Sequence, residues 1–345
     1  MIIKSIIDIV NLEVGFDLTA KSESFYPLIN VSASKGDFIA LLGRNGVGKS
    51  TFLRSIARLQ PHLAGDVKIL GTSFTKIERV EFSRRLSFIP AEPIHAANMT
   101  VYEFVSLARY PYNGWFGVLS HSDKELIHSA LDHVDLLNFS NRELDTLSDG
   151  ERQKAMIAFA FAQDSEIVLM DEPTAFIDLP AKYEIVRLLK ELTLKGKTVI
   201  FSTHDLHTAI REVDTIWLML NDGMLVGSPE DLALNGSLNR LFDGTNIYLD
   251  LASGGFLSQR GSNNRINLSA ENIIYFTWTK RALERIGYTI VLEENSSIPT
   301  IKSICNENKC FWEFQYNSTA LVFDSISKLC DYLKTLIYYS QPGNP

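Results

Sequence analysis

The sequence predicts an α/β protein with a mainly parallel, doubly wound sheet, an inserted helical subdomain and a small α+β domain at the C-terminus. Short apolar runs alternate with helical patterns up to about residue 240, an order that is typical of βαβ units. Residues 91–165 interrupt this alternation with one helical pattern after another. From about residue 243 the composition becomes rich in Gly, Ser and Asn, and new strand and helix patterns follow.

Size and charge narrow the class of protein. The chain has 345 residues, 46% of them hydrophobic and 21% charged, which suits a globular protein of two domains. A formal net charge of −8 argues against a nucleic-acid partner bound through a basic face. No apolar run approaches the roughly 20 residues of a membrane span, and the N-terminus lacks a signal-peptide pattern. We therefore expect a cytosolic chain, unless a partner holds it at a membrane.

Strand and helix patterns follow one another through the first domain, which is expected to span residues 1–242. Its predicted strands are residues 6–14, 26–31, 38–42, 67–70, 86–90, 167–170, 198–202 and 215–220. Its predicted helices are residues 51–59, 76–85, 101–108, 123–137, 150–163, 180–194 and 206–212. The helices between residues 91 and 165 form the expected helical subdomain.

A glycine-rich loop joins the strand at 38–42 to the helix at 51–59. Its sequence reads G-x-x-x-x-G-K-S, the spacing of the phosphate-binding loop of P-loop NTPases. Lys49 is expected to reach the β- and γ-phosphates, and the hydroxyl of Ser50 to bind Mg²⁺. The alternative is a glycine-rich turn without a ligand. The nucleotide-binding candidates are Gly43, Arg44, Asn45, Gly46, Val47, Gly48, Lys49, Ser50 and Thr51.

Two acidic residues follow the apolar strand at 167–170. In open α/β sheets ligands gather at the carboxyl edge of the strands, so Asp171 and Glu172 are expected to face the nucleotide. Asp171 suits a Mg²⁺ ligand, and Glu172 suits a base that polarises the attacking water. The alternative is a pair of solvated acids at the end of a strand.

A capping box opens the predicted helix at 150–163. Ser148 and Glu151 stand at its spacing, and a helix N-terminus with a serine hydroxyl and Gly150 makes a second anion site. Two phosphate sites for one nucleotide favour a dimer in which each subunit covers the nucleotide of the other. The alternative is an ordinary capped helix. Farther upstream, Phe16 is either a core residue or a surface on which adenine stacks.

Together these motifs resemble the nucleotide-binding subunits of ABC transporters over roughly residues 5–240. The phosphate loop resembles the Walker A motif, residues 147–153 the LSGGQ signature, and residues 167–172 the Walker B motif with its glutamate. Asp178 corresponds to the D-loop and His204 to the switch histidine. A closer likeness to the ATPases of importers for iron-siderophores, haem and vitamin B12 is carried by residues 100–103, 108–111 and 148–154.

The resemblance implies a site, its cofactors and its partners. ATP and Mg²⁺ are the expected cofactors, with Ser50 and Asp171 on the metal, and a homodimer would bind integral membrane permease subunits at the cytoplasmic face of the inner membrane. The residues implied in catalysis are Lys49, Glu172 and His204. The residues implied in nucleotide binding beyond the phosphate loop are Phe16, Ser148, Gly150, Glu151 and Asp178.

Three positions depart from the family pattern. Ala91, followed by Glu92, stands where the family usually has Gln, and this change could alter coupling to the membrane partner. Asp149 replaces a usual Gly, and Glu151 replaces Gln. We expect hydrolysis to survive these changes, because Lys49, Asp171, Glu172 and His204 all remain. Two other functions stay open: a soluble ABC ATPase without a transport role, and a nucleotide-sensing module with weak turnover.

The second domain is expected to span residues 243–345 and to carry an accessory, regulatory or dimer-stabilising role. Its predicted strands are residues 265–268, 289–292, 300–305 and 310–316, and its predicted helices are residues 277–285 and 325–336. Cys305, Cys310 and Cys330 are expected to be free thiols in a cytosolic chain. A zinc site at the first two is the less favoured alternative.

Overall fold

The computed structural model describes most of the chain and divides it into two compact units. The residues described are 5–18, 21–24, 26–92, 94, 96–113, 117–251, 254–258, 264–291, 298–306, 309–317 and 319–340. The first unit lies within Met1–Asp243 and Leu249–Gly255, and the second within Gly244–Tyr248 and Phe256–Pro345. Residues 244–248 are assigned to the second unit and residues 249–255 to the first.

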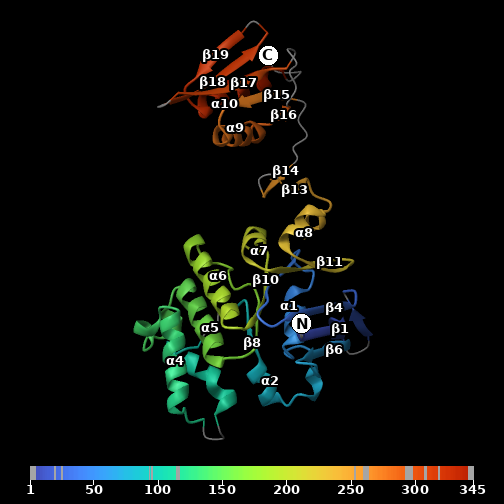
Figure 1. The fold of residues 1–345 in the computed structure, drawn as a ribbon, viewed down its shortest axis with the longest axis vertical. Helices are drawn as coiled ribbons and strands as arrows, with labels where there is room; N and C mark the ends of the chain where they lie inside the picture. Colours follow the sequence, from blue (N-terminus) through green and yellow to red (C-terminus); the bar gives the residue numbers. More distant parts are fainter. Residues whose placement is uncertain are drawn as a thin grey trace. The chain divides into compact units, whose positions relative to one another are not determined.

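A six-stranded sheet forms the centre of the first unit (Figure 1). Its strand order is β12 (Gly223–Gly227), β11 (Thr215–Leu220), β5 (Phe38–Gly43), β10 (Thr198–Thr203), β9 (Ile167–Met170) and β8 (Leu86–Ile89). All neighbouring pairs are parallel except β11 and β12, which form an antiparallel hairpin. The mainly parallel α/β fold predicted from the sequence is therefore confirmed.

The central strands are apolar because both of their faces are covered. Every residue of β5, β9 and β10 is buried, as expected for parallel strands that lie between layers. The rings of Phe38 on β5 and Phe201 on β10 lie 5.2 Å apart between their centroids. This rigid centre fixes the carboxyl ends of β5, β9 and β10, where the predicted site residues follow.

A second, antiparallel sheet was not anticipated as a separate layer. Its order is β4 (Ile29–Ser34), β1 (Ser5–Glu13), β6 (Ala64–Ile69) and β7 (Thr72–Ser73). Its strands β1, β4 and β6 overlap the predicted strands at 6–14, 26–31 and 67–70. A separate hairpin pairs β2 (Gly15–Leu18) with β3 (Lys21–Ser24). Which strands pair depends on contacts far apart in sequence, so the short apolar patterns alone did not separate the two sheets.

The first unit also contains the helices α1 to α8, some of which form its helical subdomain. The insert contains α3 (Val101–Ser106), α4 (His121–His133) and α5 (Asp149–Gln163), close to their predicted positions. Within the insert, Arg109, which follows α3, forms a buried ion pair with Asp123 of α4, and its Nε lies 2.8 Å from Asp123 Oδ1. The other helices of this unit are α1 (Lys49–Ile56), α2 (Arg79–Arg85), α6 (Leu179–Leu194), α7 (Leu206–Glu212) and α8 (Pro229–Leu234).

The second unit contains a five-stranded sheet and two helices. The sheet order is β16 (Thr289–Val291), β15 (Arg265–Ala270), β17 (Thr300–Asn306), β18 (Lys309–Tyr316) and β19 (Thr319–Phe323). The helices α9 (Ile273–Arg285) and α10 (Ile326–Ser340) bury Leu283, Leu329 and Leu333 against sheet residues such as Phe314. The α+β pattern is as predicted, with β19 added. A short hairpin, β13 (Ile247–Asp250) with β14 (Gly255–Ser258), lies in the predicted linker zone.

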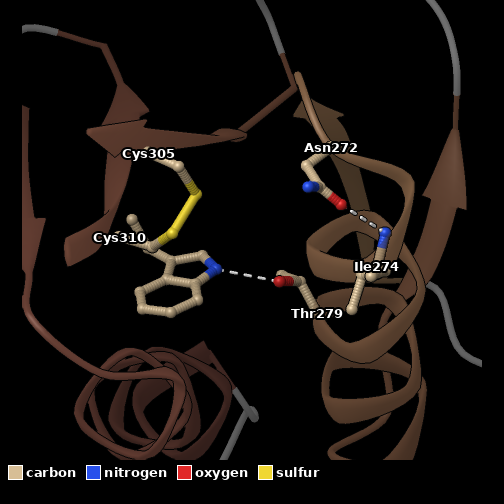
Figure 2. The surroundings of a disulfide bond; sticks show 6 residues. Asn272, Ile274, Thr279, Cys305 and Cys310 are labelled. Carbon is tan, nitrogen blue, oxygen red and sulfur yellow. Dashed lines mark hydrogen bonds between the residues drawn. A yellow bond between two sulfur atoms is a disulfide. The ribbon is translucent and has the colours of Figure 1, made fainter. Parts of the chain in front are cut away.

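The prediction of free thiols at Cys305 and Cys310 is wrong. A disulfide joins these residues across the β17–β18 hairpin (Figure 2). They are direct partners in the antiparallel ladder, and their Cα atoms lie 4.1 Å apart, so the strand register brings the sulfur atoms together. Cys330 is a buried free cysteine, as expected. None of the helices in the described part of the chain combines the length and apolar character needed to cross a membrane.

Candidate nucleotide-binding and hydrolysis site

The phosphate loop leaves β5 and enters α1 as the motif predicts. Gly48 is the N-cap of α1 and has φ of +109°, a left-handed conformation that favours glycine. Gly43 has no room for a side chain, because a Cβ there would lie 2.7 Å from the carbonyl oxygen of Met219. The loop therefore presents backbone N–H groups next to a helix N-terminus, an arrangement that binds anions.

The ammonium group of Lys49 lies inside the curve of this loop. Its Nζ donates to the carbonyl oxygen of Gly43 at 2.8 Å, and the side chain is buried. Burial lowers the pKa of Lys49, while the nearby carboxylates of Glu172 and Asp171 act in the opposite direction. The cation is thus held by the carbonyl oxygens of Gly43 and Arg44, near the two acidic residues.

Asp171 lies directly after β9 and is almost fully buried, with 1% of its surface exposed. Its backbone N–H donates to Ile89 of β8 at 2.9 Å, and its Oδ1 accepts a hydrogen bond from Ser50 Oγ at 3.0 Å. The structure therefore brings the two predicted metal ligands together. A hydroxyl and a carboxylate are the hard oxygen ligands that Mg²⁺ uses beside phosphate oxygens and water, so these residues fit the ion.

Glu172 and His204 meet at the same edge of the sheet. The Nδ1 atom of His204, which follows β10, lies 3.2 Å from Glu172 Oε2. The His204 side chain is 63% exposed, whereas that of Glu172 is only 26% exposed. Glu172 has φ of +47°, an uncommon conformation for a residue other than glycine. The geometry can place a carboxylate and an imidazole beside the terminal phosphate of a nucleotide bound in the loop.

Ser202 was missed by the sequence analysis. This buried residue of β10 donates its hydroxyl to Asp171 Oδ1 at 2.6 Å and accepts the backbone N–H of Glu172 at 2.9 Å. A serine inside an apolar strand pattern has no recognisable motif. Its position two residues before the switch histidine was the one available signal.

The signature segment forms the predicted capping box at the start of α5. The Glu151 carboxylate accepts the backbone N–H and the hydroxyl of Ser148, both at 2.8 Å, and Ser148 Oγ accepts the N–H of Glu151. These hydrogen bonds lower the pKa of Glu151. Asp149 is 65% exposed and lies 3.7 Å from Arg152 Nη1. Within one chain, the carboxylate of Glu151 therefore stabilises the N-terminus of α5.

The remaining candidates lie around these groups. Asp178 is the N-cap of α6 and accepts the N–H of Ala181 at 3.0 Å. Arg44 donates to the carbonyl oxygen of Asp243 at 3.2 Å, and with Asn45 and His204 it lines a cavity of about 370 Å³. Phe16 belongs to β2, but its side chain lies outside what the structure describes, so its stacking role stays a prediction.

The usual glutamine position lies beside this edge of the sheet, after β8. Ala91 is half-buried and Glu92 is exposed. The described residues contain no group of three or more His, Cys, Asp or Glu side chains that could hold a metal ion alone.

The fold and this site define a P-loop protein of the ATP-binding cassette class. The family profile described as ABC transporter matches residues 28–175, and the profile described as iron ABC transporter C-terminal domain matches residues 263–334. The achromobactin transport ATP-binding protein of Dickeya dadantii is 35% identical over 224 residues, which cover 64% of this chain and 83% of that protein. This chain therefore belongs to the ABC transporter family of ATP-binding proteins, and it is an ATPase.

Other relatives and solved structures agree with this assignment. The iron(3+)-hydroxamate import ATP-binding protein of Bacillus subtilis is 36% identical over 184 residues, covering 53% of this chain and 68% of the relative. The ferric enterobactin transport ATP-binding protein of Escherichia coli is 32% identical over 217 residues, covering 62% and 80%. A dimeric bacterial ABC transporter cassette superposes with a TM-score of 0.57 at 25% identity, covering 65% of this chain and 98% of that one.

Proposed function

We propose that this chain is the ATP-hydrolysing subunit of an importer for an iron–siderophore complex. Two regions of the chain support this cargo independently. Relatives of the first unit are named for the transport or import of achromobactin, iron-hydroxamate and enterobactin. Residues 263–334 match a domain described for iron ABC transporters, and this second match is the observation that carries the proposal.

In the proposed reaction, ATP lies along the phosphate loop. The loop N–H groups and Lys49 bind its phosphates, and Ser50 and Asp171 would hold Mg²⁺, which would supply positive charge next to the phosphates. Glu172 orients the attacking water and accepts its proton, and His204 contacts the γ-phosphate from the side of Glu172. Phosphoryl transfer depends mainly on positioning and on charge stabilisation, which this set of residues supplies.

We further propose that two copies of the chain close over two nucleotides. Ser148 and Gly150 of each copy would complete the site of the other, with Glu151 supporting Ser148 through the capping box. Large apolar side chains near Asp178 support this proposal, because Phe176 is 91% exposed and Leu179 is 64% exposed. Exposed apolar groups of this size commonly mark an interface.

The proposed partners in transport are integral permease subunits, which would hold this chain at the cytoplasmic face of the inner membrane. The test is to purify the chain with its permease, reconstitute both in liposomes and measure ATP-driven uptake. Ferric hydroxamate, a ferric catecholate, haem and cobalamin would be compared, and Glu172→Gln serves as the inactive control. We expect uptake of a ferric siderophore. Uptake restricted to haem or cobalamin would refute the proposed cargo, and a chain that co-purifies with no permease subunit would refute the transport role.

A further inference from the structure

Ser202 lies between the two acidic residues of the proposed site. In the β9–β10 ladder Phe201 pairs with Met170, so Ser202 stands beside Asp171, the first residue after β9. The side chain is fully buried. Its hydroxyl donates a hydrogen bond to Asp171 Oδ1, with 2.6 Å between the two oxygen atoms. The same oxygen, Ser202 Oγ, accepts a hydrogen bond from the backbone N–H of Glu172, with an N···O distance of 2.9 Å. One side chain therefore joins the proposed metal ligand to the proposed base.

The backbone of Glu172 depends on this contact. β9 ends at Met170, and the Glu172 N–H donates to a side chain of the neighbouring strand. The residue has φ of +47°, a conformation that persists only where surrounding contacts hold it. Without the hydroxyl, this N–H would lose its hydrogen-bond partner, and the direction in which the Glu172 side chain leaves the sheet would be less well defined.

Asp171 is held from two sides by hydroxyl groups. Ser50 Oγ and Ser202 Oγ donate to the same oxygen, Oδ1, at 3.0 and 2.6 Å. Ser50 belongs to α1 and is itself a proposed metal ligand, so its hydroxyl would change partner if it bound a metal ion. Ser202 belongs to the rigid centre of the sheet. It therefore fixes the carboxylate in an orientation that does not depend on the phosphate loop.

We propose that Ser202 is a positioning residue for ATP hydrolysis, acting through Asp171 and Glu172. This inference rests on the proposed function, which assigns those two residues their roles. ATP binding relies mainly on the phosphate loop and Lys49, which Ser202 does not contact through any hydrogen bond found in the described residues. Loss of the hydroxyl therefore lowers turnover much more than it lowers affinity for ATP.

The chain supplies a matched control just before the neighbouring strand β9, at the opposite end of the sheet from Asp171. Ser165 precedes β9 and is also fully buried, and its hydroxyl lies 3.0 Å from both Ser87 Oγ and the carbonyl oxygen of Ile167. Ser165→Ala and Ser202→Ala each remove one buried hydroxyl from the same sheet. A merely structural role for Ser202 would make the two variants behave alike.

The test compares the full-length wild type with Ser202→Ala, Ser202→Cys and Ser165→Ala. We expect Ser202→Ala to lower kcat by about 10- to 100-fold, as a small misplacement of reacting groups can do. The Kd for a fluorescent ATP analogue should stay within about twofold, because the phosphate loop is intact. The Mg²⁺ concentration for half-maximal turnover should rise. Ser202→Cys, which keeps a weak S–H donor, should be intermediate, and it also serves if the alanine variant fails to fold.

Each outcome decides the inference. Ser165→Ala should keep the wild-type kcat and Mg²⁺ dependence, whatever it loses in melting temperature. Turnover and Mg²⁺ dependence of Ser202→Ala equal to those of wild type or of Ser165→Ala would overturn the inference alone. If the wild type shows no ATP turnover, or if Glu172→Gln leaves its turnover unchanged, the proposed function is overturned, and the inference that rests on it is overturned as well.

Discussion

The two units of this chain bury their polar groups in different ways. In the first unit, the buried residues Asp171 and Ser202 lie at the carboxyl ends of parallel strands and share a hydrogen bond, and Lys49 is buried in the phosphate loop beside them. In the second unit, the buried polar side chains of the described residues include Thr279 and Ser303, which lie beside aliphatic and aromatic core residues. A representative buried polar contact there is the hydrogen bond that Trp312 Nε1 of β18 donates to Thr279 Oγ1 of α9 at 2.8 Å.

This difference indicates that the proposed ATP-hydrolysis chemistry belongs to the first unit, whereas the polar contacts of the second unit contribute to its stability. Parallel strands end on one edge, so residues from distant parts of the sequence meet there and can share a ligand. The second unit uses a short antiparallel meander of β17, β18 and β19, whose contacts are largely local. Changes in the first unit should therefore alter turnover, whereas changes in the second should alter its own unfolding and leave ATP binding in place.

The largest effect is expected from Glu172→Gln, which removes the proposed base. Turnover should fall by about 10²- to 10⁴-fold, the range of general acid–base catalysis, while ATP binding is retained because the phosphate loop is unchanged. Phosphate release and equilibrium binding of a fluorescent ATP analogue measure the two effects. The same variant with ATP should migrate as a dimer in size-exclusion chromatography. A monomer, both alone and with permease subunits, would refute the proposed dimer in which two copies close over two nucleotides.

Arg109→Ala should have the next largest effect, on stability. Arg109 and Asp123 are each 8% exposed, and Arg109 also donates to the carbonyl oxygen of Ala162 at 2.9 Å. Removing one partner leaves a buried carboxylate unpaired, which should cost about 3–5 kcal/mol in the free energy of unfolding. The control is Lys328→Ala, which breaks the exposed pair with Asp324 in the second unit and should cost under about 1 kcal/mol. If denaturant unfolding gave the same loss of unfolding free energy for Arg109→Ala and Lys328→Ala, this prediction would be contradicted.

The buried pair of Arg109 and Asp123 also predicts how the stability of the protein depends on pH. Hydrogen bonds from Ser120, together with Arg109, lower the pKa of Asp123 in the folded state. A lowered folded pKa stabilises the protein above the unfolded value of about 3.9, and this stability is lost as the pH falls through the folded pKa. The destabilisation caused by Arg109→Ala should therefore be full at neutral pH and shrink below about pH 4. A destabilisation that stayed constant through this range would exclude the ionised pair as its source.

A smaller effect is expected when the disulfide of the second unit is opened. Only five positions separate Cys305 from Cys310, and the ladder already pairs them, so the bond closes a short loop. Its removal should cost about 2 kcal/mol or less, because the entropy gained by the unfolded chain is small for short loops. Thermal unfolding of a Cys305→Ser/Cys310→Ser variant, with and without reductant, checks this value. ATP turnover of that variant should equal that of the wild type.

The smallest effect is expected from removing the second unit altogether. A chain that ends after residue 258 lacks β15 to α10 but keeps every residue of the proposed site. Its affinity for ATP should therefore match that of the full chain. Dimer formation and transport by the shortened chain test the predicted regulatory or dimer-stabilising role of residues 243–345. Unchanged stability, dimerisation and transport would exclude that role.

Much of the candidate site could be predicted because its residues stand in fixed local patterns. The strand, glycine loop and helix around Lys49 are contiguous, so spacing alone defined them. The capping box of Ser148 and Glu151 is equally local, and the structure has both of its hydrogen bonds. The disulfide was missed because register, which depends on the β17–β18 turn, decides whether two cysteines face each other.

The sequence by itself determined the class of protein, the order of its elements and the residues of the phosphate loop, since each of these depends on neighbours along the chain. Only the tertiary structure decided which strands share a sheet, and that Ser202 bridges Asp171 and Glu172. The reason is physical. The apolar pattern of a strand indicates which of its side chains are buried, whereas hydrogen bonds between strands depend on which segments become neighbours when the sheet forms.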